Sequence, residues 1–196
     1  MVRYLRSGAW FLGAAALALL VFAPQTASAT PITVVNGGFE TGDFTGWTVT
    51  PAGGGCSDFG VNGTDPHSGA TAAAFGSVCT GAYDSISQTV VTTPGGSATV
   101  TFWLTNAGGP SNDFQALWNG TVVFDTGFDV GPFPYTLESF TVPTPGASAV
   151  LTFQAYQVPS WFYLDDVGAQ TTAPEPASLV LLGSGLALVI RRKLRA

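Results

Sequence analysis

Apolar and polar residues alternate in short segments through the middle of the chain, and Gly, Pro, Asn and Asp separate these segments. Such alternation places apolar side chains on one face of a β-strand and polar side chains on the other. Val100, Phe102 and Leu104 share one face of such a segment. Trp103 lies on the opposite face, so the pattern predicts a strand with one buried side.

Seven segments of this kind predict strands, and none has the periodicity of a helix. They are Ser85 to Val91, Ala98 to Thr105, Phe114 to Trp118, Thr121 to Asp125, Leu137 to Val142, Ala149 to Tyr156 and Trp161 to Val167. Asn119-Gly120, between two of them, predicts a tight hairpin. Short strands joined by turns rich in Pro and Gly predict an all-β fold, an antiparallel β-sandwich of the jelly-roll type.

The first 29 residues have the pattern of a secretory signal peptide. Arg3 and Arg6 precede an apolar segment from Gly8 to Ala23, and Ala27-Ser28-Ala29 matches the small-residue cleavage pattern. We therefore expect the mature chain to begin near Thr30. An uncleaved N-terminal anchor is the alternative, because the apolar segment is only slightly too short to span a bilayer.

Residues 173–196 contain a second apolar segment, Ala177 to Ile190, which is followed by an end rich in Arg and Lys. A helix from Ala173 would be about 27 Å long, close to the bilayer core of about 30 Å. The basic end would stay in the cytoplasm, which leaves residues 30–172 outside as the sandwich domain. A buried terminal helix is the alternative, although the segment has no charged face.

All six Lys and Arg residues lie in the two terminal segments, whereas residues 30–176 contain twelve Asp and Glu residues. The formal charge of this part is therefore 0 − 12 = −12. Such a body repels nucleic acid and anionic lipid headgroups. The composition excludes nucleic-acid binding, whereas divalent cations and neutral, hydroxyl-rich ligands remain compatible.

Cys56 and Cys79 are the two cysteines, and both lie in the exported part. Because that compartment is oxidising, we expect them to form a disulfide. The bridge would close a loop of about 24 residues and stabilise the fold by about 3 kcal/mol on the loop-entropy model. Two free thiols are the alternative. A metal or redox role is not indicated, since there is no Cys-x-x-Cys and no pair of histidines.

The C-terminal end has three parts in a fixed order: Pro174-Glu175-Pro176, the apolar segment with Leu-Gly-Ser-Gly-Leu, and the basic end. This arrangement closely resembles the PEP-CTERM sorting signal of exported proteins in Gram-negative bacteria. The resemblance implies recognition of Pro174, Glu175 and Pro176 by an exosortase, a membrane-embedded peptidase. It also implies an association with exopolysaccharide and biofilm production.

A second resemblance concerns the body. Asn36-Gly-Gly-Phe39-Glu40, then Gly46-Trp47, and finally Phe162 to Val167 resemble the bracketing pattern of galactose-binding-like jelly rolls, the fold of several carbohydrate-binding modules. The resemblance implies a structural calcium ion with Glu40 and Asp165 as carboxylate ligands. Alternatively, these carboxylates are bonded to backbone N–H groups at the edge of the sandwich.

Exposed aromatic rings can stack on sugar rings. Trp47, in the family-like pattern, is expected in the core. Trp103 faces away from the apolar residues of its strand, and Trp161 begins a strand at a loop, so these two are the candidate ligand-binding residues. The other aromatic residues available for binding are Trp118, Tyr83, Tyr135 and Tyr156.

The composition leaves little material for catalysis. His67 is the only histidine, in a segment typical of a turn, so a Ser-His-Asp triad and multi-histidine zinc sites are not expected. A glycosidase needs only two carboxylates, but the sequence singles out no pair. We expect no enzymatic activity and assign no catalytic residue.

Together these features predict an exported, non-catalytic surface or matrix-associated protein. It would be anchored in the inner membrane before sorting, and then lie at the cell surface or outside the cell. The alternative is a carbohydrate-binding module that recognises an extracellular polysaccharide. An exposed aromatic pair in a groove would favour the binding module, and a smooth polar face would favour the structural role.

Overall fold

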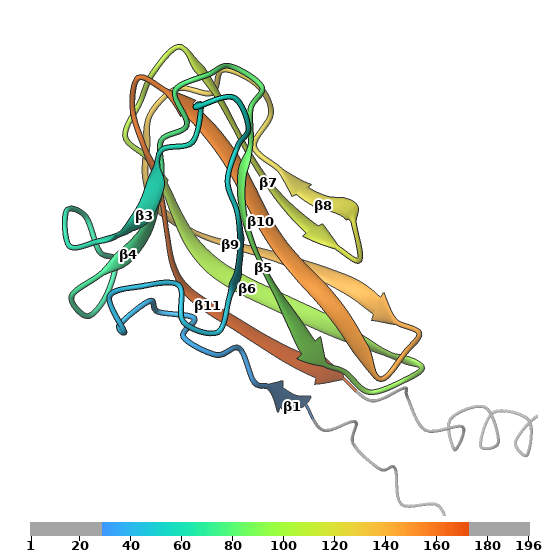
Figure 1. Ribbon diagram of the computed structural model, residues 1–196. Coiled ribbons are helices and arrows are strands. Elements are labelled where there is room, and N and C mark those ends of the chain that lie inside the picture. The colour runs from blue at the N-terminus through green and yellow to red at the C-terminus, as the bar shows by residue number, and fades with distance from the viewer. Residues whose placement is uncertain (1–28, 173–196) are drawn as a thin grey trace, which may run out of the picture. The chain divides into compact units, whose positions relative to one another are not determined.

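The computed structural model describes residues 29–172, and these residues form two antiparallel β-sheets (Figure 1). Residues Ala29–Ala173 make one compact unit. The predicted all-β sandwich is confirmed. The predicted signal peptide and C-terminal helix lie outside the described residues, apart from Ala29. Within the described range, no helix is long and apolar enough to cross a membrane.

The first sheet has six strands in the order β3-β4-β11-β6-β9, and β1 pairs with β11 beside this path. Its strands are β1 (Ala29–Ile32), β3 (Phe59–Asn62), β4 (Ala72–Phe75), β6 (Gly96–Asn106), β9 (Phe133–Thr144) and β11 (Phe162–Thr172). Pro134 and Pro143 fall in β9, which is an edge strand and therefore tolerates the missing N–H groups.

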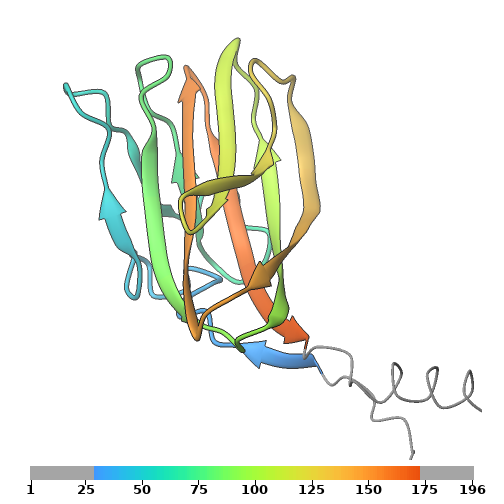
Figure 2. The ribbon, with the colours of Figure 1, turned by 90° about the vertical axis from the view of Figure 1, so that its right-hand side faces the viewer.

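The second sheet has five strands in the order β2-β5-β10-β7-β8. They are β2 (Thr48–Thr50), β5 (Asp84–Val91), β7 (Ser111–Trp118), β8 (Thr121–Asp125) and β10 (Ser148–Val158). Figure 2 looks onto this sheet and shows β5, β10 and β7 side by side. β10 is central and pairs with β5 on one side and β7 on the other.

The strands predicted from the alternating pattern correspond to β5 through β11, most of them longer than expected. The hairpin at Asn119-Gly120 is confirmed, and both residues have the positive φ angles, 50° and 79°, that such a tight turn requires. β11 begins at Phe162, one residue later than expected, and continues past Val167 through a bulge. The pattern did not predict β1 to β4.

Phenylalanine rings fill the space between the two sheets. Phe102 of β6 and Phe153 of β10 are both fully buried, and their ring centroids lie 5.1 Å apart. Phe114 of β7 meets Phe162 of β11 in the same way at 5.5 Å. Trp47 is buried in this core, as expected. These rings join one sheet to the other and fix which side chains of β6, β7, β10 and β11 face the interior.

The predicted disulfide between Cys56 and Cys79 is present. It joins the loop after β2 to the loop before β5. Main-chain bonds add to it, because Val78 N donates to Cys56 O at 2.8 Å and Gly76 N donates to Asp58 O at 2.7 Å. The two loops are therefore held as one unit at the start of β5.

We predict that replacing Cys56 and Cys79 together with alanine lowers the free energy of unfolding by about 3 kcal/mol, because the unfolded chain regains loop entropy. Denaturant unfolding of the full chain measures the loss. Wild-type protein in reducing agent is the control and should match the double variant. A change below about 1 kcal/mol would show that the main-chain bonds alone hold the two loops.

Candidate functional site

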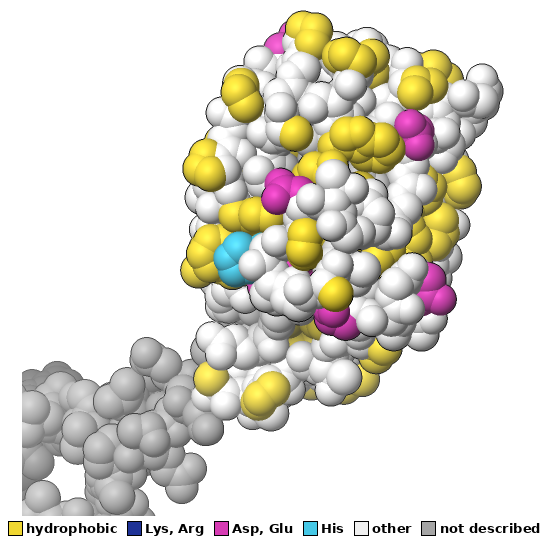
Figure 3. Space-filling model, turned by 90° about the vertical axis from the view of Figure 1, so that its left-hand side faces the viewer, with side chains coloured by type: hydrophobic (Ala, Val, Ile, Leu, Met, Phe, Trp, Pro, Cys, Tyr) yellow, Lys and Arg dark blue, Asp and Glu magenta, His cyan; other side chains and the backbone are white. Residues whose placement is uncertain are grey.

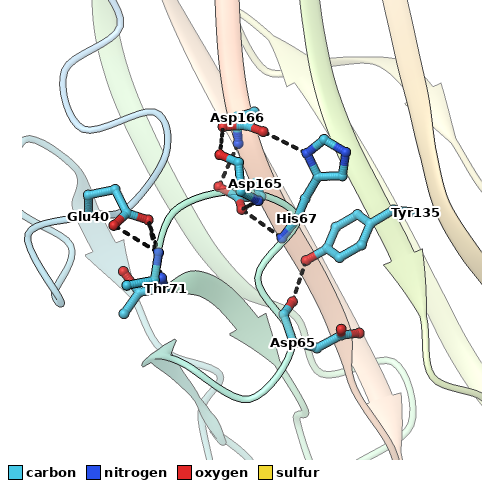
Figure 4. A network of polar contacts seen from close by, with 9 residues as sticks. Glu40, Asp65, His67, Thr71, Tyr135, Asp165 and Asp166 are labelled. Carbon is cyan, nitrogen blue, oxygen red and sulfur yellow. Dashed lines mark hydrogen bonds and ion pairs between the residues drawn. The ribbon is translucent and has the colours of Figure 1, made fainter.

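Asp165 of β11 holds the loop between β3 and β4 against the first sheet (Figure 4). Its Oδ2 atom accepts hydrogen bonds from the main-chain N–H groups of His67 at 2.9 Å and Ser68 at 3.1 Å. Its Oδ1 atom accepts one from Asp166 N at 2.7 Å. Asp165 is fully buried, and burial raises its pKa, although the backbone bond from Ser68 opposes this effect.

Glu40 holds the other half of the same loop. Its carboxylate accepts hydrogen bonds from the main-chain N–H groups of Ala70 at 3.0 Å and Thr71 at 3.1 Å. Gly69 lies directly against this carboxylate with a φ of 61°, and a Cβ at that position would lie 2.3 Å from Glu40 Oε1. The Gly residue therefore allows the close approach that the two N–H bonds need.

The calcium ion implied at Glu40 and Asp165 stays a prediction. The described part of the chain contains no group of three or more His, Cys, Asp or Glu side chains placed to hold a metal ion. The oxygen atoms of both carboxylates face main-chain N–H donors. This arrangement matches the other role that the sequence left open, in which the two carboxylates anchor backbone N–H groups.

His67 is part of the folded surface of the first sheet. Its ring stacks on Trp103 of β6 with centroids 3.9 Å apart, and its Nδ1 atom lies 2.7 Å from Asp166 Oδ2. Tyr135 of β9 packs edge-on against the same imidazole, and its hydroxyl donates to the carbonyl of Asp65 at 2.6 Å. His67 therefore covers Trp103, one of the two aromatic residues expected to bind a ligand.

Trp161, the other candidate, is half-buried and also packs within the protein. It lies flat on Gly76, where a Cβ atom would come within 2.6 Å of the indole ring. It also packs against a small cluster formed by Ala72, Ala74 and Tyr163. Trp103 and Trp161 therefore do not form a free coplanar pair on the first sheet. The face in Figure 3 shows the imidazole among apolar and acidic side chains, with no Lys or Arg.

The outer face of the second sheet carries a row of polar side chains, one from each of its strands. Strand register aligns them, because Thr50 pairs with Ser85, Ser85 with Gln154, Gln154 with Gln115, and Gln115 with Asp125. We call these five residues the polar row. With about 4.8 Å between neighbouring strands, the row is about 19 Å long. None of its five residues is buried.

Hydrogen bonds orient the amides within the polar row. Gln154 Nε2 donates to Gln115 Oε1 at 2.8 Å. Gln115 Nε2 then donates to Asp125 Oδ2 at 3.1 Å and to Asp113 Oδ2 at 3.0 Å. Each amide therefore has a fixed orientation, and Asp125 is also held by Gly127 N, which donates to its Oδ1 atom at 2.6 Å.

Two tyrosines lie beside the polar row. Tyr83 and Tyr156 meet edge to face with centroids 5.1 Å apart, and the Tyr83 hydroxyl donates to Asp113 Oδ2. Tyr83 lies four residues after Cys79, so the disulfide-bonded loops position it. Burial and the neighbouring Asp113 raise the pKa of Tyr83 well above its ordinary value, which keeps its hydroxyl protonated as a donor.

Asp113 is fully buried beneath this cluster, and its Oδ1 atom has no hydrogen-bond partner among the described residues. Burial raises the pKa of Asp113, and the nearby Asp125 carboxylate adds to this effect, whereas the Tyr83 hydroxyl bond opposes it. An unpaired carboxylate oxygen in the interior is costly. Asp113 therefore differs from Asp165, since both carboxylate oxygens of Asp165 accept main-chain hydrogen bonds.

A cavity of about 560 Å³ lies beside the polar row, where β5 approaches β1. Hydroxyl groups of Thr48, Ser87 and Thr89 line it, together with the apolar side chains of Val35 and Val91. Thr48 and Ser87 lie two residues from Thr50 and Ser85 on the same face. The hydroxyl-rich surface of the second sheet therefore extends from the polar row into this cavity.

Sequence reasoning missed the polar row. Alternation in the two predicted strands Phe114 to Trp118 and Ala149 to Tyr156 could have placed Gln115 and Gln154 opposite the apolar residues, and Tyr83 and Tyr156 were among the available aromatic residues. However, alternation shows only which face a side chain occupies. The alignment of these residues across five strands depends on register, which the sequence pattern alone did not provide.

The comparison with family models finds the PEP-CTERM protein-sorting motif at residues 172–195. The predicted motif residues, Pro174 to Pro176, fall within this match, and they lie outside the described residues. The motif implies an exported protein that passes through a stage with a C-terminal membrane anchor. No curated protein matches the chain.

The jelly-roll fold of the body is shared with carbohydrate-binding modules. The chain is 19% identical to TmCBM61, solved in complex with β-1,4-galactotriose, with a TM-score of 0.52 over 69% of this chain and 95% of that one. It is 15% identical to the CBM22-1 xylan-binding domain of Paenibacillus barcinonensis Xyn10C, with a TM-score of 0.51 over 78% and 99% of the two chains.

A third similar structure is an adhesin domain, the cleaved K3 domain of Lys-gingipain from Porphyromonas gingivalis W83. The identity is 14%, and the TM-score is 0.56 over 73% of this chain and 99% of that one. At such low identities the likeness shows the fold alone. The predicted jelly-roll sandwich agrees with these neighbours.

We predict that Asp165→Ala lowers the free energy of unfolding by about 3 kcal/mol, because it leaves three main-chain N–H groups without an acceptor. Denaturant unfolding of the full chain measures the change. Asp65→Ala is the matched control, since the Asp65 side chain is exposed, and it should change stability by less than about 0.5 kcal/mol. Equal effects of the two substitutions would contradict the anchoring role.

The same unfolding curves in Ca²⁺ and in EDTA test the calcium expectation. A calcium ion held by Glu40 and Asp165 would stabilise the wild type by mass action and leave Asp165→Ala unchanged. Identical wild-type curves in the two solutions would contradict calcium binding.

Proposed function

We propose that this chain is a surface-sorted, non-catalytic protein whose body binds an extracellular polysaccharide through the polar row of the second sheet. The observation that carries the proposal is the alignment of five solvent-accessible polar side chains across five strands. Sugars present closely spaced hydroxyl groups, which act both as donors and as acceptors. Side-chain amides, carboxylates and hydroxyls provide the complementary groups.

The order within the polar row supports this function. Gln115 and Gln154 are oriented by one another and by the neighbouring carboxylates before any ligand arrives. Such preorganisation reduces the entropy lost when a ligand binds. A row about 19 Å long is also suited to several consecutive sugar units rather than to a single one.

The sorting motif and the fold are consistent with this proposal. A protein delivered to the cell surface meets polysaccharide there, and two of the similar folds belong to a module solved in complex with galactotriose and to a xylan-binding domain. The described body also has no Lys or Arg, so neutral glycans suit its surface better than anionic ones.

We propose no reaction. Asp113 and Asp125 are the carboxylates nearest to one another on this face, but Asp113 is fully buried beneath Tyr83 and Gln115. A glycosidase needs two carboxylates that reach the scissile bond from an open cleft. The geometry therefore favours binding over hydrolysis.

We predict that the double variant Gln115→Ala with Gln154→Ala binds soluble galactan, xylan or β-glucan about tenfold more weakly than the wild type, because two oriented amides are lost. Affinity electrophoresis of the full chain in detergent, with each polysaccharide in the gel, measures the loss. Gln170→Ala is the control, since Gln170 is exposed on the first sheet.

Equal retardation of the double variant and the control would place binding outside the polar row. If the wild type is not retarded by any glycan, neutral or charged, the binding function fails and the structural surface role remains.

We propose further that an exosortase-type membrane peptidase processes the C-terminal motif. With Pro174, Glu175 and Pro176 replaced by alanine, the protein should keep its full C-terminal mass and stay in the membrane fraction. The wild type should be shorter by the tail and leave that fraction. Cell fractionation with mass spectrometry of an epitope-tagged chain measures both properties. Wild-type protein that keeps an intact tail in the membrane would contradict processing and leave the tail as a permanent anchor.

A further inference from the structure

Asp113 and Asp125, which we call the acidic pair, share one amide group on the outer face of the second sheet. Gln115 Nε2 donates to Oδ2 of both residues, at 3.0 and 3.1 Å. The amide is neutral and can supply two hydrogen bonds, but it cannot balance two negative charges. Gly127 N adds a bond to Asp125 Oδ1 at 2.6 Å, and the Tyr83 hydroxyl adds one to Asp113, but these donors are also neutral and leave the two charges without a cation.

No basic side chain from the described part of the chain compensates this charge. Residues 29–172 contain no Lys or Arg, and His67 lies on the first sheet, where it pairs with Asp166. Asp165 of the first sheet accepts three main-chain N–H bonds, and Glu40 accepts two. In contrast, the fully buried Asp113 has an Oδ1 atom without any partner.

The aromatic groups beside the acidic pair also favour a cation. Tyr83 donates its hydroxyl to Asp113, and Tyr156 packs against the Tyr83 ring. Faces of aromatic rings attract cations, and carboxylates in the same site strengthen that attraction. The Asp129 carboxylate adds negative potential, since with Asp113 it raises the pKa of Tyr156, for which burial is the main cause.

We infer that the polar row selects a polysaccharide with free amino groups, an N-deacetylated amino-sugar polymer, whose ammonium groups are balanced by the acidic pair. This inference rests on the proposed polysaccharide-binding function and specifies its ligand class. Asp125 is exposed and supplies the direct contact, whereas Asp113 contributes its charge from behind Gln115. A neutral sugar gains only ordinary hydrogen bonds at this place, and an ammonium group gains charge-assisted ones, which are about twice as strong.

Three β-1,4-linked hexamers test the inference, because they differ only in the group at C2: cellohexaose has a hydroxyl, the N-acetylglucosamine hexamer has an acetamide, and the glucosamine hexamer has an ammonium group. Titration calorimetry of the full chain in detergent, at slightly acidic pH and in EDTA, measures each affinity. We expect the glucosamine hexamer to bind about tenfold more tightly than cellohexaose, and added salt to reduce this advantage.

Asp125→Asn should remove the advantage of the glucosamine hexamer over cellohexaose, because asparagine keeps the shape of the side chain and loses its charge; the ratio of the two affinities is the readout. Asp65→Asn is the matched control. It removes the same charge from an exposed residue near the first sheet, and should preserve the advantage. If both variants lose the advantage of the glucosamine hexamer equally, the advantage depends only on the net charge of the protein, and the inference is overturned.

The remaining outcomes separate the ligand class from the function. If cellohexaose or the acetylated hexamer binds as tightly as the glucosamine hexamer, the ligand class is wrong and the polysaccharide-binding function stands. If neutral hexamers bind only when Ca²⁺ replaces EDTA, the acidic pair takes a metal ion and the inference fails. If none of the hexamers or soluble polysaccharides binds, both proposals fail.

Discussion

The packing of phenylalanine rings between the two sheets is the interaction on which the rest of the structure depends. Phe153 of β10 is buried against Phe102 of the opposite sheet, so its neighbour Gln154 must face solvent. Phe114 fixes Gln115 of β7 in the same way. A shift of one residue in either strand would bury an amide and expose a ring, which makes the register of the polar row a consequence of the core.

The absence of Lys and Arg from the body explains how its carboxylates are held. Asp84 accepts main-chain hydrogen bonds from Ala52 at 2.7 Å and Asp58 at 3.1 Å, and Glu40 and Asp165 each anchor a loop in the same manner. Backbone N–H groups thus perform the role that basic side chains have in most proteins. The acidic pair has less of this support: Gly127 N donates to Asp125 Oδ1 at 2.6 Å, but the buried Oδ1 atom of Asp113 has no partner among the described residues.

The fold could be predicted from the sequence where alternation was strong, and not elsewhere. β6 alternates from Ser97 to Leu104 and β10 from Ser148 to Ala155, and their buried faces are those predicted. β4 reads Ala-Ala-Ala-Phe with all four residues buried, so it does not alternate, and β2 has only three residues, too few for its alternation to predict a strand. β2 pairs with the longer strand β5, and β4 pairs with the longer strand β11. These tertiary contacts stabilise the two short strands, and the local sequence does not predict them.

The candidate site was less predictable than the fold. Trp103 was correctly placed on the outer face of its strand, but alternation cannot show that a loop folds back and lays His67 over the indole. Trp161 is covered for a similar reason, since Gly76 from another strand's loop admits it. Only glycine allows this contact, yet the sequence does not show which aromatic ring will lie there. Exposure of an aromatic residue is thus set by long-range contacts.

The pairing of β1 with β11 and the direction of β5 show where the acidic pair lies relative to the two ends of the described body. β1 pairs with the end of β11, Ala29 beside Thr172, so both ends of the described body meet at one point. Thr30 and Thr171 line the same cavity as Val91, which places the end of β5 there too (Figure 1). Tyr83 precedes the first residue of β5, and seven extended steps separate Asp84 from Val91, about 24 Å. Asp113 pairs with Tyr156 and Gln115 with Gln154 near the start of β5, so the acidic pair lies at the end of the body opposite to Ala29 and Thr172.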